Sequence, residues 1–207
     1  MLQLNHEDVA QLLTPAEAID AVRAGLREQA AGQAQLPPRT TTDYTSGKGW
    51  RRLMPVIMNG SGYMGFKAMH STPKVGVRYW IALYGMDSGE LLATIDADWI
   101  TSHRTSAMVA VATDAVVDDI CHVLESGDGR SGLASGQLAE GRMAELWRIV
   151  SGQAAGRVAD TQLTLFKSVG TALQDLSLAI AIYRRAQERH VGQDAGDFPH
   201  IRPFGRQ

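Results

Sequence analysis

The chain has 207 residues, of which 44% are hydrophobic and 20% charged, the composition of an ordinary soluble globular protein with a sizeable core. The net charge of −2 gives no attraction for nucleic acid or an anionic membrane surface, so we expect neither as a partner. A single cysteine, Cys121, excludes an internal disulfide, and neither a transmembrane stretch nor a signal-peptide pattern is present, so a cytoplasmic location is expected.

The first strong helix signal covers residues 13–32. Thr14, Pro15 and Glu17 form the pattern of a helix start, with a capping threonine, a proline in the first helical position and a glutamate that completes a capping box. The apolar residues that follow share the spacing of one buried helix face: Ile19, Val22 and Leu26.

Residues 37–100 change to short segments rich in β-branched and aromatic residues, separated by turn residues. The predicted strands are residues 39–45, 50–58, 63–70, 77–86 and 90–97. Asp87 and Gly89 between the last two are typical of a hairpin turn. The pattern therefore predicts an antiparallel meander and not a series of βαβ units.

The rest of the chain alternates between helical and strand-like segments. The expected elements are a helix over 100–113, a strand over 114–119, a Gly/Ser loop over 125–136, a helix over 140–152, a strand over 161–168 and a final amphipathic helix over 171–190. The buried stripe of the last helix is expected to be Leu173, Leu176, Ile180 and Tyr183. Together these elements predict an α+β fold, a mainly antiparallel sheet with an N-terminal helix and C-terminal helices packed on it.

Gly60, Gly62 and Gly65 have the G-x-G-x-x-G spacing of a dinucleotide-binding loop. Such a loop must lead directly into a helix, whose N-terminus holds the pyrophosphate. Here Pro73 blocks a helix of useful length, and Pro55 lies inside the preceding strand. The glycines therefore predict a β-turn between two strands.

Asp118, Asp119 and His122 offer the chemistry of metal ligands. A strand end followed by a polar loop is the favoured interpretation of this segment, and no metal site is predicted.

Three cations stand at strand ends or helix starts: Arg39 in LPPRT, Lys67 in GFKAMHSTP and Arg104 in ITSHRTSA. In these contexts the chain resembles the ornithine cyclodeaminase/mu-crystallin family, which includes alanine dehydrogenases and imine reductases. Further segments that resemble the family follow in order: residues 53–55, 87–101, 103–107, 145–157 and 161–179. The resemblance extends to about residue 192.

The resemblance implies a substrate-binding and dimerising domain with a Rossmann NAD(P)-binding domain inserted after the helix that begins near Arg104. The predicted helix over 100–113 leads directly into the strand over 114–119, whereas a single βαβ unit takes about 30 residues. We therefore expect no Rossmann domain. Residues 1–192 are expected to form one domain from two family segments, 1–112 and 114–192, followed by a loose tail over 193–207.

By resemblance, Arg39, Lys67 and Arg104 converge on the carboxylate and the carbonyl or imine group of a substrate, and Lys67 is the catalytic residue if the chain is active. Guanidinium groups suit a carboxylate, and a lysine supplies a compact charge or a proton. Each cation alone is also compatible with a solvated surface position. Thr105 and Ser168 match nucleotide-binding positions, and without a nucleotide domain their expected roles are to cap a helix and to finish a strand.

Three functions remain open. The first is a homodimeric module that binds a small amino, keto or imino acid without redox activity and without a cofactor, although the family uses NAD(P). The second is an amino- or imino-acid oxidoreductase or cyclodeaminase whose nucleotide domain comes from another chain, or cofactor-free chemistry at Lys67. The third is a domain-deletion scaffold with no ligand. The family's acid/base aspartate belongs to the missing segment, so no residue inherits its role.

Overall fold

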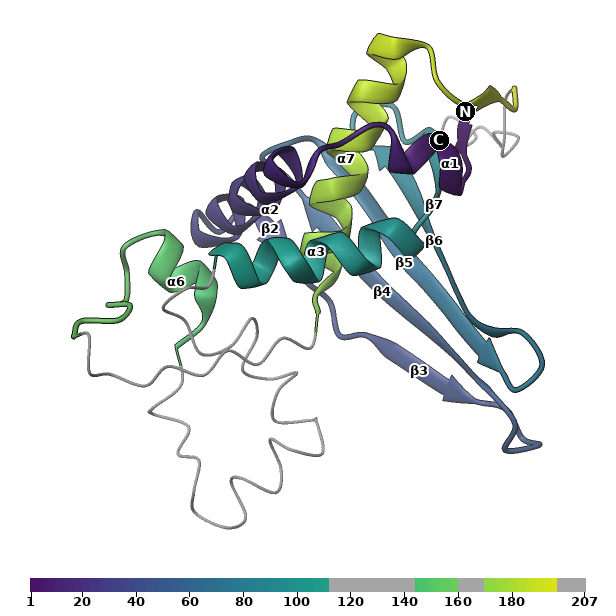
Figure 1. The fold of residues 1–207 in the computed structure, drawn as a ribbon, viewed down its shortest axis with the longest axis horizontal. Coiled ribbons are helices and arrows are strands. Elements are labelled where there is room, and N and C mark those ends of the chain that lie inside the picture. The colour runs from purple at the N-terminus through teal and green to yellow at the C-terminus, as the bar shows by residue number, and fades with distance from the viewer. Residues whose placement is uncertain (112–143, 160–169, 197–207) are drawn as a thin grey trace, which may run out of the picture.

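The computed structural model describes residues 1–111, 144–159 and 170–196, with the backbone alone over 105–111. In these residues a mixed, mostly antiparallel sheet is covered by helices (Figure 1). The strands are β1 (Leu2–Leu4), β2 (Ala34–Gln35), β3 (Thr40–Asp43), β4 (Trp50–Met58), β5 (Tyr63–Thr72), β6 (Gly76–Gly85), β7 (Leu91–Asp96) and β8 (Gln193–Asp194). The helices are α1 (His6–Ala10), α2 (Pro15–Ala30), α3 (Asp98–Val111), α6 (Leu146–Val150) and α7 (Ala172–Arg189).

The sheet has the order β2-β4-β5-β6-β7-β1-β8, with β3 also paired to β4. β4, β5, β6 and β7 form the antiparallel meander that the sequence predicts, and the hairpin between β6 and β7 turns through Gly89 at a φ of 68°. β1 pairs parallel to β7, which makes the sheet mixed. The predicted helix start is also confirmed, because Thr14 and Glu17 form the capping box of α2.

Several short elements were not predicted. β1 and α1 precede the first predicted helix, and Gln193–Asp194, which the sequence assigns to a loose tail, pairs with β1 as β8. The chain reaches β1 because His190 adopts a left-handed conformation at the end of α7 and Gly192 follows with positive φ. The predicted helix over 140–152 is shorter in its described part, where α6 covers Leu146–Val150.

Other predicted features lie outside the described residues. These are the strands over 114–119 and 161–168, the loop over 125–136, Cys121, Ser168 and the Asp118, Asp119 and His122 group. Among the described residues, no helix is both long and apolar enough to cross a membrane.

Gly60 and Gly62 lie in the turn between β4 and β5, as predicted, whereas Gly65 lies within β5. Gly62 has a φ of 79°, which favours glycine. A carboxylate oxygen of Glu28 in α2 accepts hydrogen bonds from the backbone N–H groups of Gly60 at 2.8 Å and Ser61 at 3.1 Å. The turn therefore binds a carboxylate of its own chain and fixes the end of α2 against the sheet.

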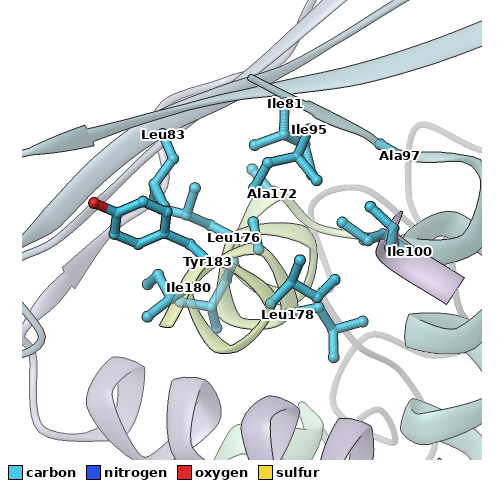
Figure 2. Packing of buried hydrophobic residues seen from close by; sticks show 14 of the residues in the cluster. Ile81, Leu83, Ile95, Ala97, Ile100, Ala172, Leu176, Leu178, Ile180 and Tyr183 are labelled. Carbon is cyan, nitrogen blue, oxygen red and sulfur yellow. The ribbon is translucent and has the colours of Figure 1, made fainter. Parts of the chain in front are cut away.

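The hydrophobic core lies between α7 and the sheet. The predicted stripe of α7 is buried in full, and Figure 2 shows side chains of this helix meeting Ile81, Leu83 and Ile95 from β6 and β7. α2 and α3 pack against α7. Two glycines let neighbouring elements pack closely. A Cβ on Gly65 of β5 would overlap the backbone of β6, and a Cβ on Gly25 of α2 would overlap Ser177 of α7.

The opposite face of the sheet carries partly exposed apolar side chains. Leu53 is 37% exposed and Trp80 is 40% exposed. The Phe66 ring lies 5.5 Å from that of Trp80 and 6.5 Å from that of Tyr84, measured between centroids. Because side chains alternate along a strand, these residues point away from the helices that cover the face of Lys67. We call Leu53, Phe66, Trp80 and Tyr84 the outer face.

Candidate functional site

Lys67 lies at the centre of β5 with its side chain only 1% exposed. Its antiparallel partners, Met54 on β4 and Ile81 on β6, are buried on the same face of the sheet. The sequence alternation that directs apolar side chains into the core therefore directs this ammonium group there as well. A buried charge must be compensated by an ion pair or hydrogen bonds.

Two helices supply the partners of Lys67. Its Nζ donates to Thr101 Oγ1 of α3 at 2.7 Å and to Asp175 Oδ1 of α7 at 3.0 Å. The Thr101 hydroxyl donates to the carbonyl oxygen of Ala97 at 2.5 Å, so its oxygen accepts from the lysine. The ring of Tyr79 lies 5.1 Å from Nζ, within the range of a cation–π contact.

Arg104 reaches the same carboxylate from α3. Its Nε lies 3.3 Å from Asp175 Oδ1, and its Nη1 donates to Gln174 Oε1 at 3.1 Å. Arg104 is 11% exposed and Asp175 is 1% exposed. We call Lys67, Thr101, Arg104, Gln174 and Asp175 the cation cluster.

Gly170 leaves the space that the Arg104 side chain occupies. A Cβ at this position would overlap the guanidinium group, and the φ of 77° is itself one that favours glycine. The segment just before α7 is therefore shaped to hold the arginine.

Burial lowers the pKa of Lys67, and the nearby Arg104 acts in the same direction. The Asp175 carboxylate opposes both effects, and Asp98 adds a smaller contribution with the same sign as Asp175. With two cations and one carboxylate in contact, the cation cluster has an excess of positive charge when Lys67 is protonated.

Two buried polar atoms of the cluster, Arg104 Nε and Asp175 Oδ2, have no hydrogen-bond partner among the described residues. A buried polar atom without a hydrogen bond costs about 1–3 kcal/mol. The arrangement therefore favours an additional polar group beside the two side chains.

The structure thus brings Lys67 and Arg104 together, two of the three cations that the sequence singles out. Arg39 is half-buried just before β3, next to Thr40, whose partner on β4 is Leu53. Its convergence with the other two cations stays a prediction. Thr105 lies within α3 and Ser168 lies outside the described residues, so their assigned roles also stay predictions.

Sequence reasoning did not assign a role to Asp175, Gln174, Thr101 or Gly170. The available signal was a polar pair inside an otherwise apolar helix start, where Gln174 and Asp175 interrupt the run that contains Leu173 and Leu176. Leu173, Gln174, Asp175 and Leu176 are all buried. Within the described parts of the chain, no group of three His, Cys, Asp or Glu side chains is arranged to hold a metal ion.

The sequence model of the ornithine cyclodeaminase/mu-crystallin family matches residues 1–124 and 114–190 of this chain. The chain is 41% identical over 90 residues to a Δ1-pyrroline-2-carboxylate reductase of Bacillus cereus, covering 42% of this chain and 28% of that protein. It is 36% identical over 117 residues to an alanine dehydrogenase of Archaeoglobus fulgidus, and this match covers 54% of this chain and 35% of that protein. The matches therefore span about a third of the length of these relatives.

Solved structures share the fold. The Δ1-pyrroline-2-carboxylate reductase of Thermococcus litoralis, in complex with NADH and L-proline, aligns with a TM-score of 0.88 at 21% identity, over 94% of this chain and 100% of that one. An archaeal alanine dehydrogenase dimer with bound NAD aligns with a TM-score of 0.83 at 20% identity, over 93% and 98%. At these identities the likeness establishes the fold alone.

Proposed function

Because the chain belongs to the ornithine cyclodeaminase/mu-crystallin family, we propose that it is a dimerising module that binds a small amino, keto or imino acid by its carboxylate and has no redox activity of its own. The observation that carries this proposal is the meeting of two cations, the buried Lys67 and the partly buried Arg104, at a single carboxylate. The excess positive charge favours one additional carboxylate, and an arginine fork is suited to bind it.

The two cations have different roles in this proposal. Arg104 is 11% exposed, whereas Lys67 is 1% exposed. The ligand carboxylate therefore reaches the guanidinium group first, and Lys67 adds its charge from the centre of the sheet. Contact between the ligand carboxylate and Arg104 Nε would also satisfy a buried donor that has no hydrogen bond within the described residues.

The redox part of the proposal rests on the length of the match. The family model matches in two stretches that meet near residues 114–124, and the curated relatives are matched over about a third of their length. The first of these facts supports a chain in which the two family segments follow one another without the inserted nucleotide domain. Without it, NAD(P) loses its pyrophosphate and adenosine contacts, and each tenfold loss of affinity corresponds to about 1.4 kcal/mol.

Dimerisation is proposed to use the outer face. Its apolar residues are partly exposed on a sheet face opposite the helices, with Leu53 and Trp80 the most accessible of the four. A second copy of the chain packed against this face would remove them from water. The archaeal alanine dehydrogenase that shares the fold is itself a dimer, which agrees with this proposal.

Isothermal titration calorimetry with pyruvate, L-alanine and L-ornithine tests the binding site. We expect at least one acid to bind, and we expect Arg104→Gln to lower its affinity at least tenfold. Arg184→Gln is the matched control, because Arg184 is an exposed arginine on α7 whose Nε lies 3.4 Å from the Tyr63 hydroxyl. Absence of heat with all three acids, or an unchanged affinity of Arg104→Gln, would contradict the proposal.

An NADH fluorescence titration separates the redox alternatives. We expect no binding to the chain alone. Turnover of a substrate by the chain alone with a pyridine nucleotide would refute the redox-inactive function, and turnover only after a second protein is added would support a nucleotide domain supplied by another chain.

A further inference from the structure

Asp175 lies where the two cations of the cluster meet. Its Oδ1 is 3.0 Å from Lys67 Nζ and 3.3 Å from Arg104 Nε, and its side chain is 1% exposed. Three elements, β5, α3 and α7, therefore contribute one charged residue each to a single contact point. We infer that Asp175 is a positioning residue, which fixes Lys67 and Arg104 for the ligand carboxylate and keeps Lys67 charged.

The geometry supports this role because the two cations would repel each other without the carboxylate between them. Asp175 lies in the first turn of α7, where the helix dipole favours a negative charge. The inference depends on the proposed function only in that the ligand is taken to bind at Lys67 and Arg104. The contact between Asp175 and Lys67 does not depend on any ligand.

The charge on Lys67 reflects all the groups that face it. Asp175 faces it from α7, Thr101 and Arg104 from α3, and the Tyr79 ring from β6. Burial is the largest influence on the pKa of Lys67 and lowers it, Arg104 lowers it further, and Asp175 and Asp98 raise it. Removal of the Asp175 charge therefore makes Lys67 lose its proton at a lower pH.

Nuclear magnetic resonance on the full chain measures this directly. The chain has four lysines, Lys48, Lys67, Lys74 and Lys167, so selective lysine labelling gives few signals, and Lys67→Arg identifies the one of interest. We expect the Lys67 pKa to be lower in Asp175→Asn than in the wild-type protein. An unchanged Lys67 pKa in a folded Asp175→Asn protein would overturn the inference.

Glu17→Gln is the matched control, because it converts a carboxylate of another ion pair to an amide. Glu17 pairs with Arg185 at 2.6 Å on the partly exposed side of α2. We expect this variant to leave the Lys67 titration unchanged. A shift of the same size in the control would mean that the effect of Asp175→Asn is general and not specific to the contact.

The affinity for pyruvate, measured as a function of pH, connects the contact to the ligand. We expect binding to weaken as the pH rises through the pKa of Lys67, and to weaken at a lower pH in Asp175→Asn. If the Lys67 pKa shifts as expected but no acid binds, the proposed function fails and the role of Asp175 in keeping Lys67 charged stands. If an acid binds with the same pH profile in both proteins, the positioning role fails and the binding function stands.

A folding defect in Asp175→Asn also gives a decisive result. The double variant Lys67→Met/Asp175→Asn removes both members of the buried pair, so we expect it to regain a cooperative thermal transition that the single variant lacks. If the losses of the two single variants simply add in the double variant, Asp175 does not act through Lys67 and the inference is overturned.

Discussion

The guanidinium group of Arg104 lies against the backbone of Gly170, in the volume that a Cβ would fill. Arg104 lies within α3 and Gly170 just before α7, and the two residues are 66 positions apart in the chain. The missing side chain at Gly170 and the contacts of Arg104 with Gln174 and Asp175 therefore together define the position of the arginine.

Gly170→Ala is expected to displace Arg104 and to destabilise the fold by about 1–3 kcal/mol, because a non-glycine residue is strained at positive φ. Gly152→Ala is the control, since Gly152 has a φ of 75° but no described atom near the position of its Cβ. Both variants should lose stability in urea unfolding, but only Gly170→Ala should lose affinity for the acid. Equal affinities in the two variants would show that Gly170 does not position Arg104.

The stability of the protein should depend on the charge of Lys67. Because the folded-state pKa of Lys67 lies below the ordinary value of 10.5, the unfolded chain binds more protons between the two values, and Lys67 makes the folded state more stable as the pH rises through that window. In Lys67→Met this contribution is lost. The difference in unfolding free energy between wild type and variant, from urea titrations, should therefore increase as the pH approaches 10.5, and a constant difference would contradict this prediction.

Glu17 should contribute to acid sensitivity. The hydrogen bond from the Thr14 backbone, followed by those from the Thr14 hydroxyl and Arg185, lowers its pKa from 4.5 to about 2. The stabilisation is therefore present above about 4.5 and is lost as the pH falls to about 2. Thermal unfolding of Glu17→Gln should show a smaller fall in Tm over this range than the wild type.

Asp20→Asn is the control for Glu17. Asp20 is an exposed acid on the same helix that pairs with Arg23 at 2.8 Å and does not cap the helix. We expect this variant to keep the acid sensitivity of the wild type. The same loss of sensitivity in both variants would assign the effect to the overall charge of α2.

Trp80→Glu should convert a dimer to a monomer if the outer face forms the interface. Trp80 is 40% exposed and its ring is in contact with Phe66, so a carboxylate there would be buried without a partner in the dimer. Light scattering should show half the mass of the wild type. Val75→Glu, at an exposed position in the turn between β5 and β6, should leave the mass unchanged.

The long elements were predictable from sequence because their local signals agree with their environment. The predicted strand over 50–58 coincides with β4 even though it contains Pro55. β2 pairs with residues 57–58 and β3 with residues 50–53, so the proline lies in the gap between these two partners, where its missing N–H costs little.

The short elements and most of the cation cluster depend on contacts that sequence spacing does not encode. β1 and β8 have three and two residues and are strands only because they pair with each other and with β7. Asp175 is typical of a solvated helix start, and its burial follows from the packing of α7 against β5. Lys67 and Arg104 were identified by resemblance, and no local pattern predicts that they meet at this carboxylate.

Glu28 occupies backbone N–H groups of the glycine-rich turn that another molecule could otherwise bind. Two N–H groups that would suit a phosphate oxygen already donate to a carboxylate of the same chain, which competes intramolecularly with any free anion. A nucleotide would have to displace this carboxylate, and in doing so would detach the C-terminal end of α2 from the turn between β4 and β5.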